Sequence, residues 1–292
     1  MTYKQVLTTA SDLLKGMNGK TLDVLEISKP SSIEYAQNLA KVISKLSPLI
    51  GNMIEFATVE KLNEIKWDDN GHWIRQDPGF PDALFVSNLS TSPGIEIKTW
   101  FPLATEITAR FKDSIVHFKK NQTNVALIAW LPEYILYGKP KIVDVWIGSA
   151  KELAIARDKH YHNPPDYLVF EPEDTSKRTA NLQQTNTNGY KFQGNRKLFQ
   201  QAEKEALSLG INGQNPYDPT PKYQQIIKKL LGKYPYRLDT NFAKIDRIEH
   251  QGLEEFKTKV LSKKLLGNTI QEWSTLLGTD ERTIRYLLEE LV

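Results

Sequence analysis

Apolar residues in the first part of the chain recur at helical spacing. From Tyr3 to about Ile65 they follow one another at intervals of three and four residues, which predicts amphipathic helices that each bury one face. Pro30 and Pro48 interrupt this pattern, because proline lacks a backbone N–H and tends to end a helix. A further helix is therefore expected to begin near Gly51.

Between Trp67 and Gly148 the pattern changes to that of strands. Four short runs are rich in β-branched and aromatic residues, and they cover residues 83–86, 94–100, 125–130 and 142–147. The apolar residues between Glu106 and Lys120 predict a helix between the second and third runs. Helices followed by two strands, a helix and two strands predict an α/β fold with a mixed β-sheet flanked by helices.

The pattern changes again near residue 171. Residues 171–197 are almost entirely polar, rich in amides and interrupted by Gly189 and Gly194, which predicts a long functional loop or an irregular hairpin. Residues 216–221 have the composition of a linker, and helical patterns follow it to the C-terminus. These changes predict one domain over 1–215, with a core at about 50–150, and a helical region over 222–292.

Composition narrows the choice of function. The chain has 292 residues and a net charge of +3, which is far from the basic excess of a protein that coats nucleic acid without sequence preference. It contains no cysteine, which excludes disulfides, Cys-liganded metals and a thiol nucleophile. The N-terminus lacks the pattern of a signal peptide and no apolar stretch is long enough to cross a bilayer, so we expect a cytoplasmic protein with no membrane contact.

Two carboxylates and a lysine stand close together in the predicted hairpin. Asp82 follows Pro81 at the start of the first run, and Glu96 and Lys98 lie inside the second. Side chains alternate across a strand, so Glu96 and Lys98 share one face and Asp82 can lie across the hairpin from them. Two neighbouring carboxylates favour a hard divalent cation such as Mg²⁺, beside which an ammonium group can stabilise a phosphate.

The motif Glu-x-Lys is weak by itself. It occurs at Glu64–Lys66, Glu96–Lys98 and Glu255–Lys257, but only the middle copy lies in a strand pattern after a Pro-Asp pair. The alternative is an exposed hairpin face with an ordinary ion pair.

Pro81-Asp82 and Glu96-Ile97-Lys98, at this spacing, resemble the signature of the PD-(D/E)xK nucleases, and among them the type II restriction endonucleases. The resemblance implies a restriction-endonuclease-like core and magnesium-dependent hydrolysis of DNA. Asp82, Glu96 and the carbonyl of Ile97 would hold Mg²⁺, and Lys98 would position the attacking water.

The segment from Gly51 to Glu55 resembles a helix that carries a further active-site glutamate in this family, although a solvated helix residue is the alternative for Glu55. The strand over 94–99 also resembles that of the MutH-type mismatch-repair nucleases. A homodimer acting on double-stranded DNA is expected if the target is palindromic, because two equivalent centres then cut both strands.

The polar loop is the first candidate for contacts with DNA. Cations suit phosphates, and amides and guanidinium groups suit base edges. The candidate residues are Lys177, Arg178, Asn188, Tyr190, Lys191, Arg196 and Lys197. The alternative is a surface loop that is merely hydrophilic.

The C-terminus is the second candidate. Residues 269–277 predict one helix, Gly278 a turn, and Thr279 or Asp280 the cap of a second helix, an arrangement that resembles a helix-turn-helix. Arg282 and Arg285 would then face DNA from the second helix. Because acidic residues outnumber basic ones over 251–292, the motif could instead serve packing or dimerisation. A regulator that binds DNA without cutting it is the alternative from a different functional class.

Overall fold

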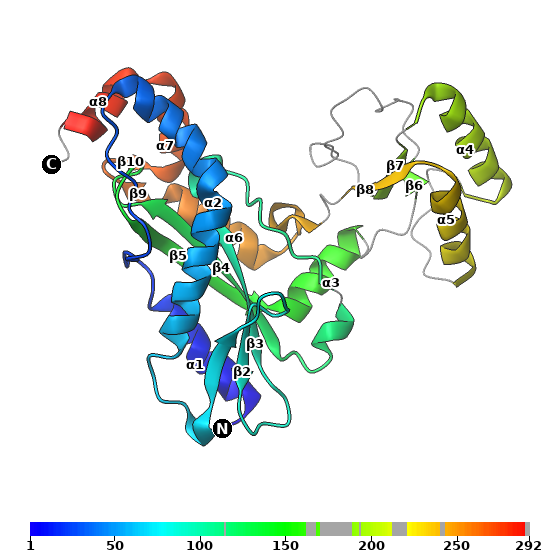
Figure 1. Ribbon diagram of the computed structural model, residues 1–292, viewed down its shortest axis with the longest axis horizontal. Helices are drawn as coiled ribbons and strands as arrows, with labels where there is room; N and C mark the ends of the chain where they lie inside the picture. The colour runs from blue at the N-terminus through cyan, green and yellow to red at the C-terminus, as the bar shows by residue number, and fades with distance from the viewer. Residues whose placement is uncertain are drawn as a thin grey trace. The chain divides into compact units, whose positions relative to one another are not determined.

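The computed structural model describes residues 1–113, 115–161, 168–169, 189–192, 194–211, 221–239 and 243–289. The chain divides into two compact units, one formed by residues 1–110, 115–153 and 250–292, the other by 111–114 and 154–249. Figure 1 labels the helices and strands. None of the described helices is long and apolar enough to cross a membrane.

The first unit contains one five-stranded sheet in the order β1-β2-β3-β4-β5. Its strands are β1 (His72–Arg75), β2 (Ala83–Val86), β3 (Gly94–Trp100), β4 (Thr123–Pro132) and β5 (Pro140–Ser149). β3 and β4 are parallel, whereas the other neighbours are antiparallel. The predicted α/β class with a mixed sheet is confirmed.

Helices cover both faces of this sheet. α2 (Ile33–Leu62) approaches Thr99 of β3 through Gly51, and α6 (Gln251–Ser262) places Phe256 against Trp100, with ring centroids 6.1 Å apart. Since neighbouring residues on a strand point to opposite faces, α2 and α6 lie on opposite sides of the sheet. α1 (Tyr3–Lys15) packs on α2 and β5, and α3 (Ala150–Tyr161) follows β5.

Two local predictions are wrong. α2 continues through Pro48, because Ile43 and Ile50 are buried on either side of it and hold both halves of the helix on the core. The helix expected over 106–120 is absent among the described residues of that range, which hold only a 3-10 turn at Ile115–Phe118. There the apolar residues Ile107 and Phe111 anchor an irregular segment instead.

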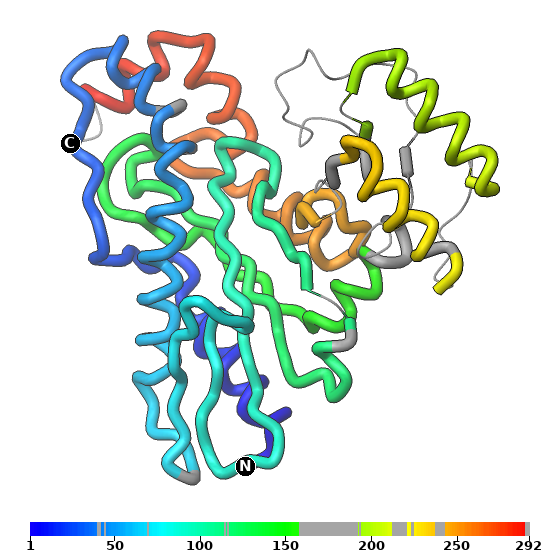
Figure 2. The backbone as a smooth tube through the Cα atoms, turned by 45° about the vertical axis from the view of Figure 1, so that its right-hand side comes forward, coloured from blue at the N-terminus to red at the C-terminus, as the bar shows by residue number. Residues whose placement is uncertain are grey.

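The C-terminal helices belong to the first unit. α7 (Ile270–Thr279) and α8 (Glu281–Glu289) bury Trp273, Leu277 and Ile284 in one cluster with Ala36 of α2 and with residues 135–137. α2 therefore runs from these helices to the β1–β2 hairpin, as Figure 1 and Figure 2 show. The sequence suggested a domain boundary between 215 and 222. The chain does not divide into its two units there, because this apolar cluster joins residues 270–289 to the sheet domain.

Gly278 also differs from its expected role. It lies within α7, and the chain turns at Asp280, whose carboxylate accepts hydrogen bonds from the Arg282 N–H (3.1 Å) and the Thr283 hydroxyl (2.7 Å). Of the two caps that the sequence suggested, Asp280 is the one used. A single residue separates the helices, which is shorter than the usual turn of a helix-turn-helix.

The second unit has its own small sheet and core. The sheet contains β6 (Leu168–Val169), β7 (Gly189–Phe192) and β8 (Tyr236–Asp239). α4 (Arg196–Ser208) and α5 (Pro221–Lys233) enclose a cluster that includes Ala202, Ala206 and Leu230. Residues 189–192, which lie in the segment expected to be a long loop or an irregular hairpin, form the strand β7 between β6 and β8.

Candidate active site

Asp82 and Glu96 meet where two strands diverge. β2 and β3 pair only at Ala83–Ile95 and Leu84–Gly94, and Asp82 directly precedes β2. The Oδ2 atom of Asp82 accepts a hydrogen bond from the Ile97 N–H at 2.7 Å. The backbone N–H of Asp82 donates a hydrogen bond to Glu96 Oε2 at 3.2 Å. The divergence therefore leaves room for side chains while the two hydrogen bonds hold both carboxylates at one point.

The ammonium group of Lys98 lies between these two carboxylates. Its ammonium nitrogen lies 3.2 Å from Asp82 Oδ2 and 3.2 Å from the carbonyl oxygen of Ile97, and it also donates to Glu96 Oε1. Burial opposes the charge on Lys98, but the carboxylates of Glu96 and Asp82 prevail and hold its pKa above the ordinary value. We call these three oxygens the oxygen cage; it surrounds one positive charge.

The oxygen cage suits a divalent cation. Two carboxylates and a main-chain carbonyl are hard oxygen ligands of the kind that Mg²⁺ prefers, and the Lys98 ammonium marks where a cation is stabilised. In the part of the chain that the structure describes, no three His, Asp or Glu side chains converge as a ready metal site. A metal ion would therefore have to displace the ammonium group and complete its coordination with water.

Glu55 lies on α2 beside the same point. It lines a cavity of about 400 Å³ together with Gly51, Lys98 and Thr99. Burial, followed by the nearby carboxylate of Asp82, raises the pKa of Glu55 above its ordinary value. Glu55 is thus a partly buried carboxylate that faces the site, and the alternative of a solvated helix residue does not hold.

Arg75 is a residue of this site that the sequence analysis missed. Its Nε donates to Glu55 Oε1 at 2.7 Å, and its guanidinium also pairs with Asp77 and lies 4.3 Å from the centre of the Phe56 ring. β1 pairs with β2 so that Arg75 faces Ala83, the residue after Asp82. The sequence feature that could have identified Arg75 is a cationic residue in the strand before the Pro-Asp pair.

Gly51, about one helical turn before Glu55, occupies a position with no room for a side chain. A Cβ atom at this position would lie 2.7 Å from the Thr99 hydroxyl oxygen, which is closer than real Cβ contacts allow. The missing side chain lets α2 approach β3 closely enough for Glu55 to line the cavity beside Lys98.

The predicted DNA-contacting residues are distributed over both units. Arg282 and Arg285 are exposed on α8 of the first unit, where Arg285 pairs with Glu289. In the second unit Tyr190 and Lys191 lie in β7, and Arg196 and Lys197 form the exposed start of α4. Three further candidates lie outside the described residues: Lys177, Arg178 and Asn188.

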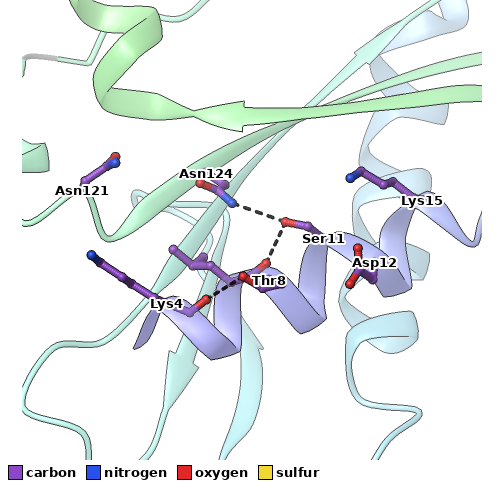
Figure 3. A pocket seen from close by; sticks show the side chains of 8 residues that line it. Lys4, Thr8, Ser11, Asp12, Lys15, Asn121 and Asn124 are labelled. Atoms are coloured by element: carbon purple, nitrogen blue, oxygen red, sulfur yellow. Dashed lines mark hydrogen bonds between the residues drawn. The ribbon is translucent and has the colours of Figure 1, made fainter. Parts of the chain in front are cut away.

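A second cavity, of about 420 Å³, lies beside α1. Figure 3 shows the hydrogen bonds made there by the side chains of Asn124, Ser11 and Thr8. Asn124 donates to the Ser11 hydroxyl at 3.4 Å, and the hydroxyls of Thr8 and Ser11 donate to carbonyls one turn earlier. Because its hydroxyls are engaged in this way, we assign it no chemistry.

No protein-family model, curated protein or solved structure matches the chain.

Proposed function

We propose that the protein is a magnesium-dependent nuclease that hydrolyses phosphodiester bonds of double-stranded DNA in the manner of a type II restriction endonuclease. The observation that carries this proposal is the oxygen cage, in which Asp82, Glu96 and the Ile97 carbonyl all bind one cationic group. The divergence of β2 and β3 supports the proposal, because Asp82 and Glu96 lie just beyond the last paired residues of the two strands and converge there. The five-stranded mixed sheet is compatible with a restriction-endonuclease-like core.

Each residue has a defined role in this proposal. Asp82, Glu96 and the Ile97 carbonyl would hold the metal, and the bound ion would polarise the phosphate and lower the pKa of a coordinated water. Lys98, two residues beyond Glu96, would leave the oxygen cage to the metal and orient the attacking water. Arg75 holds the Glu55 carboxylate at the edge of the cavity, where it can accept a hydrogen bond from a water molecule.

Cleavage of supercoiled plasmid and phage DNA tests the proposal. The wild type is expected to nick or fragment DNA with Mg²⁺, and the Glu96→Gln variant to lose this activity. Glu255→Gln is the matched control, because Glu255 belongs to another Glu-x-Lys motif and is exposed on α6. If the wild type binds varied DNA but never cuts it in the presence of Mg²⁺, the regulator alternative replaces the nuclease proposal.

The products also separate the two nuclease alternatives. Discrete double-stranded fragments from sequenced DNA favour a restriction enzyme, whereas nicks in one strand favour a MutH-like repair enzyme. Replacing Mg²⁺ by Ca²⁺ provides a second control, because Ca²⁺ binds the same oxygen ligands with a larger and more flexible coordination shell.

A further inference from the structure

An apolar stripe lies exposed along α2. Its side chains are between 38% and 55% exposed although all are large and hydrophobic. We call Tyr35, Val42, Leu46, Leu49 and Phe56 the α2 stripe. Exposed apolar side chains scattered singly are ordinary, but five of them along one side of a single helix favour an interaction surface.

The spacing of the α2 stripe is that of a coiled coil. Tyr35, Val42, Leu49 and Phe56 follow one another at intervals of seven residues, and Leu46 occupies the second apolar position of the repeat. A repeat of seven residues keeps one seam of a helix facing a partner helix. The stripe therefore fits another helix with the same repeat.

The α2 stripe is separate from the other two working faces of the helix. Ile43, Ile50 and Ile54 are fully buried and fasten α2 to the core. Gly51 and Glu55 face the cavity of the candidate active site. At 100° per residue the stripe is a third face, and only its Phe56 end adjoins the candidate active site, because the Arg75 guanidinium lies 4.3 Å from the centre of the Phe56 ring. A partner helix can therefore occupy the rest of the stripe while the core contacts remain as they are.

A second copy of this chain is the partner that fits the stripe. An interface about a two-fold axis must be complementary to itself. The stripe meets this requirement, because aromatic residues stand at its ends and aliphatic residues at its centre. Two antiparallel α2 helices would thus place Leu46 and Leu49 near the axis, and the Tyr35 end of one copy against the Phe56 end of the other.

The available area indicates how strong such a pairing is. The exposed parts of these five side chains offer roughly 400–500 Å² per copy, since a fully buried aromatic residue contributes about 150–250 Å². Two copies would bury roughly 800–1,000 Å² in total, which belongs to the class of weak and transient interfaces. The dimer is therefore expected to be weak and reversible, so its fraction should rise with protein concentration.

We propose that the α2 stripe is a homodimer interface in which two α2 helices pack antiparallel about an axis near Leu46 and Leu49. The inference rests on the exposure and spacing of the stripe and does not depend on the nuclease proposal. Loss of either proposal would leave the other intact, because one is tested by self-association and the other by DNA cleavage.

Sedimentation equilibrium of the full chain at about 1–200 µM tests the interface. The wild type should associate reversibly, and Leu49→Glu should weaken association at least tenfold without lowering the melting temperature. Leu207→Glu, an equally exposed leucine of α4, is the matched control and should associate as the wild type does. A monomeric wild type, or equal effects of the two substitutions, overturns the proposal.

Cross-linking tests the orientation, because the chain has no cysteine of its own. Leu46→Cys should form a disulfide dimer on oxidation, whereas Tyr35→Cys should do so only when mixed with Phe56→Cys. Efficient self-linking of Tyr35→Cys excludes the antiparallel arrangement. If Leu46→Cys is a monomer whose introduced thiol resists alkylation, another part of the same chain covers the stripe, and this result overturns the proposal.

Discussion

The Lys98 ammonium occupies the position proposed for a metal ion, so replacing it should change metal affinity directly. In Lys98→Met the side chain stays unbranched and is shorter by one atom, and it loses its charge. Asp82 and Glu96 are then left close together without a cation between them. We expect this variant to bind Mg²⁺ or Ca²⁺ more tightly than the wild type, although it cannot orient water and should not cleave DNA.

The size of the effect follows from the bonds that a metal ion must break. Lys98 has a side chain only 20% exposed and donates to two carboxylates. Hydrogen bonds to charged groups contribute about 1.5–3 kcal/mol each, and the burial of Lys98 offsets part of the sum. If the net cost of displacing Lys98 equals the free energy of one such hydrogen bond, the variant should bind the metal roughly 10- to 150-fold more tightly.

Isothermal titration with Ca²⁺ in the absence of DNA measures this difference. Lys66→Met is the control, because Lys66 stands in another Glu-x-Lys motif and is exposed, so its removal should leave the affinity unchanged. Equal or weaker binding by Lys98→Met would refute the reasoning, since it would mean that the ammonium and the metal do not compete for the same oxygens.

Three further substitutions test contacts that stabilise the first unit. Asp144→Asn should lower the free energy of unfolding by about 2 kcal/mol, because Asp144 is 1% exposed and pairs with Lys259 and Lys263. Burial opposes the charge of Asp144, but these two lysines prevail and keep its pKa below the ordinary value, so the stabilisation should be present above about pH 4 and be lost as the pH falls further. Trp273→Ala should cost about 3–5 kcal/mol, because the indole is fully buried. Gly51→Ala should cost about 1–3 kcal/mol and reduce cleavage, because the added methyl group separates α2 from β3.

Urea unfolding measures all three differences in stability. The Asp144 prediction is contradicted if the wild type and the Asn variant differ by the same amount at pH 3 and pH 7. A loss below 1 kcal/mol for the Trp273 variant would mean that the C-terminal helices unfold independently of the sheet. Unchanged stability and cleavage in the Gly51 variant would show that the close approach of α2 to β3 is unnecessary.

Local patterns alone identified most of the sheet and the candidate site. Alternation along residues 94–100 correctly placed Glu96 and Lys98 on one face, and the preceding run correctly placed Asp82 beside them. These features could be predicted because they depend on the period of a strand and on a short hairpin. Pro48 and the segment 106–120 were interpreted wrongly because burial against distant residues outweighed local preference.

The sequence by itself therefore determined the fold class, most strand positions and the residue types of the oxygen cage, since all of these depend on neighbours along the chain. Only the tertiary structure decided that Arg75 holds Glu55, that Lys98 occupies the oxygen cage and that α7 and α8 pack with the sheet domain. The physical reason is that each of these contacts joins separate elements. Their formation depends on how those elements pack, which spacing along the chain does not specify.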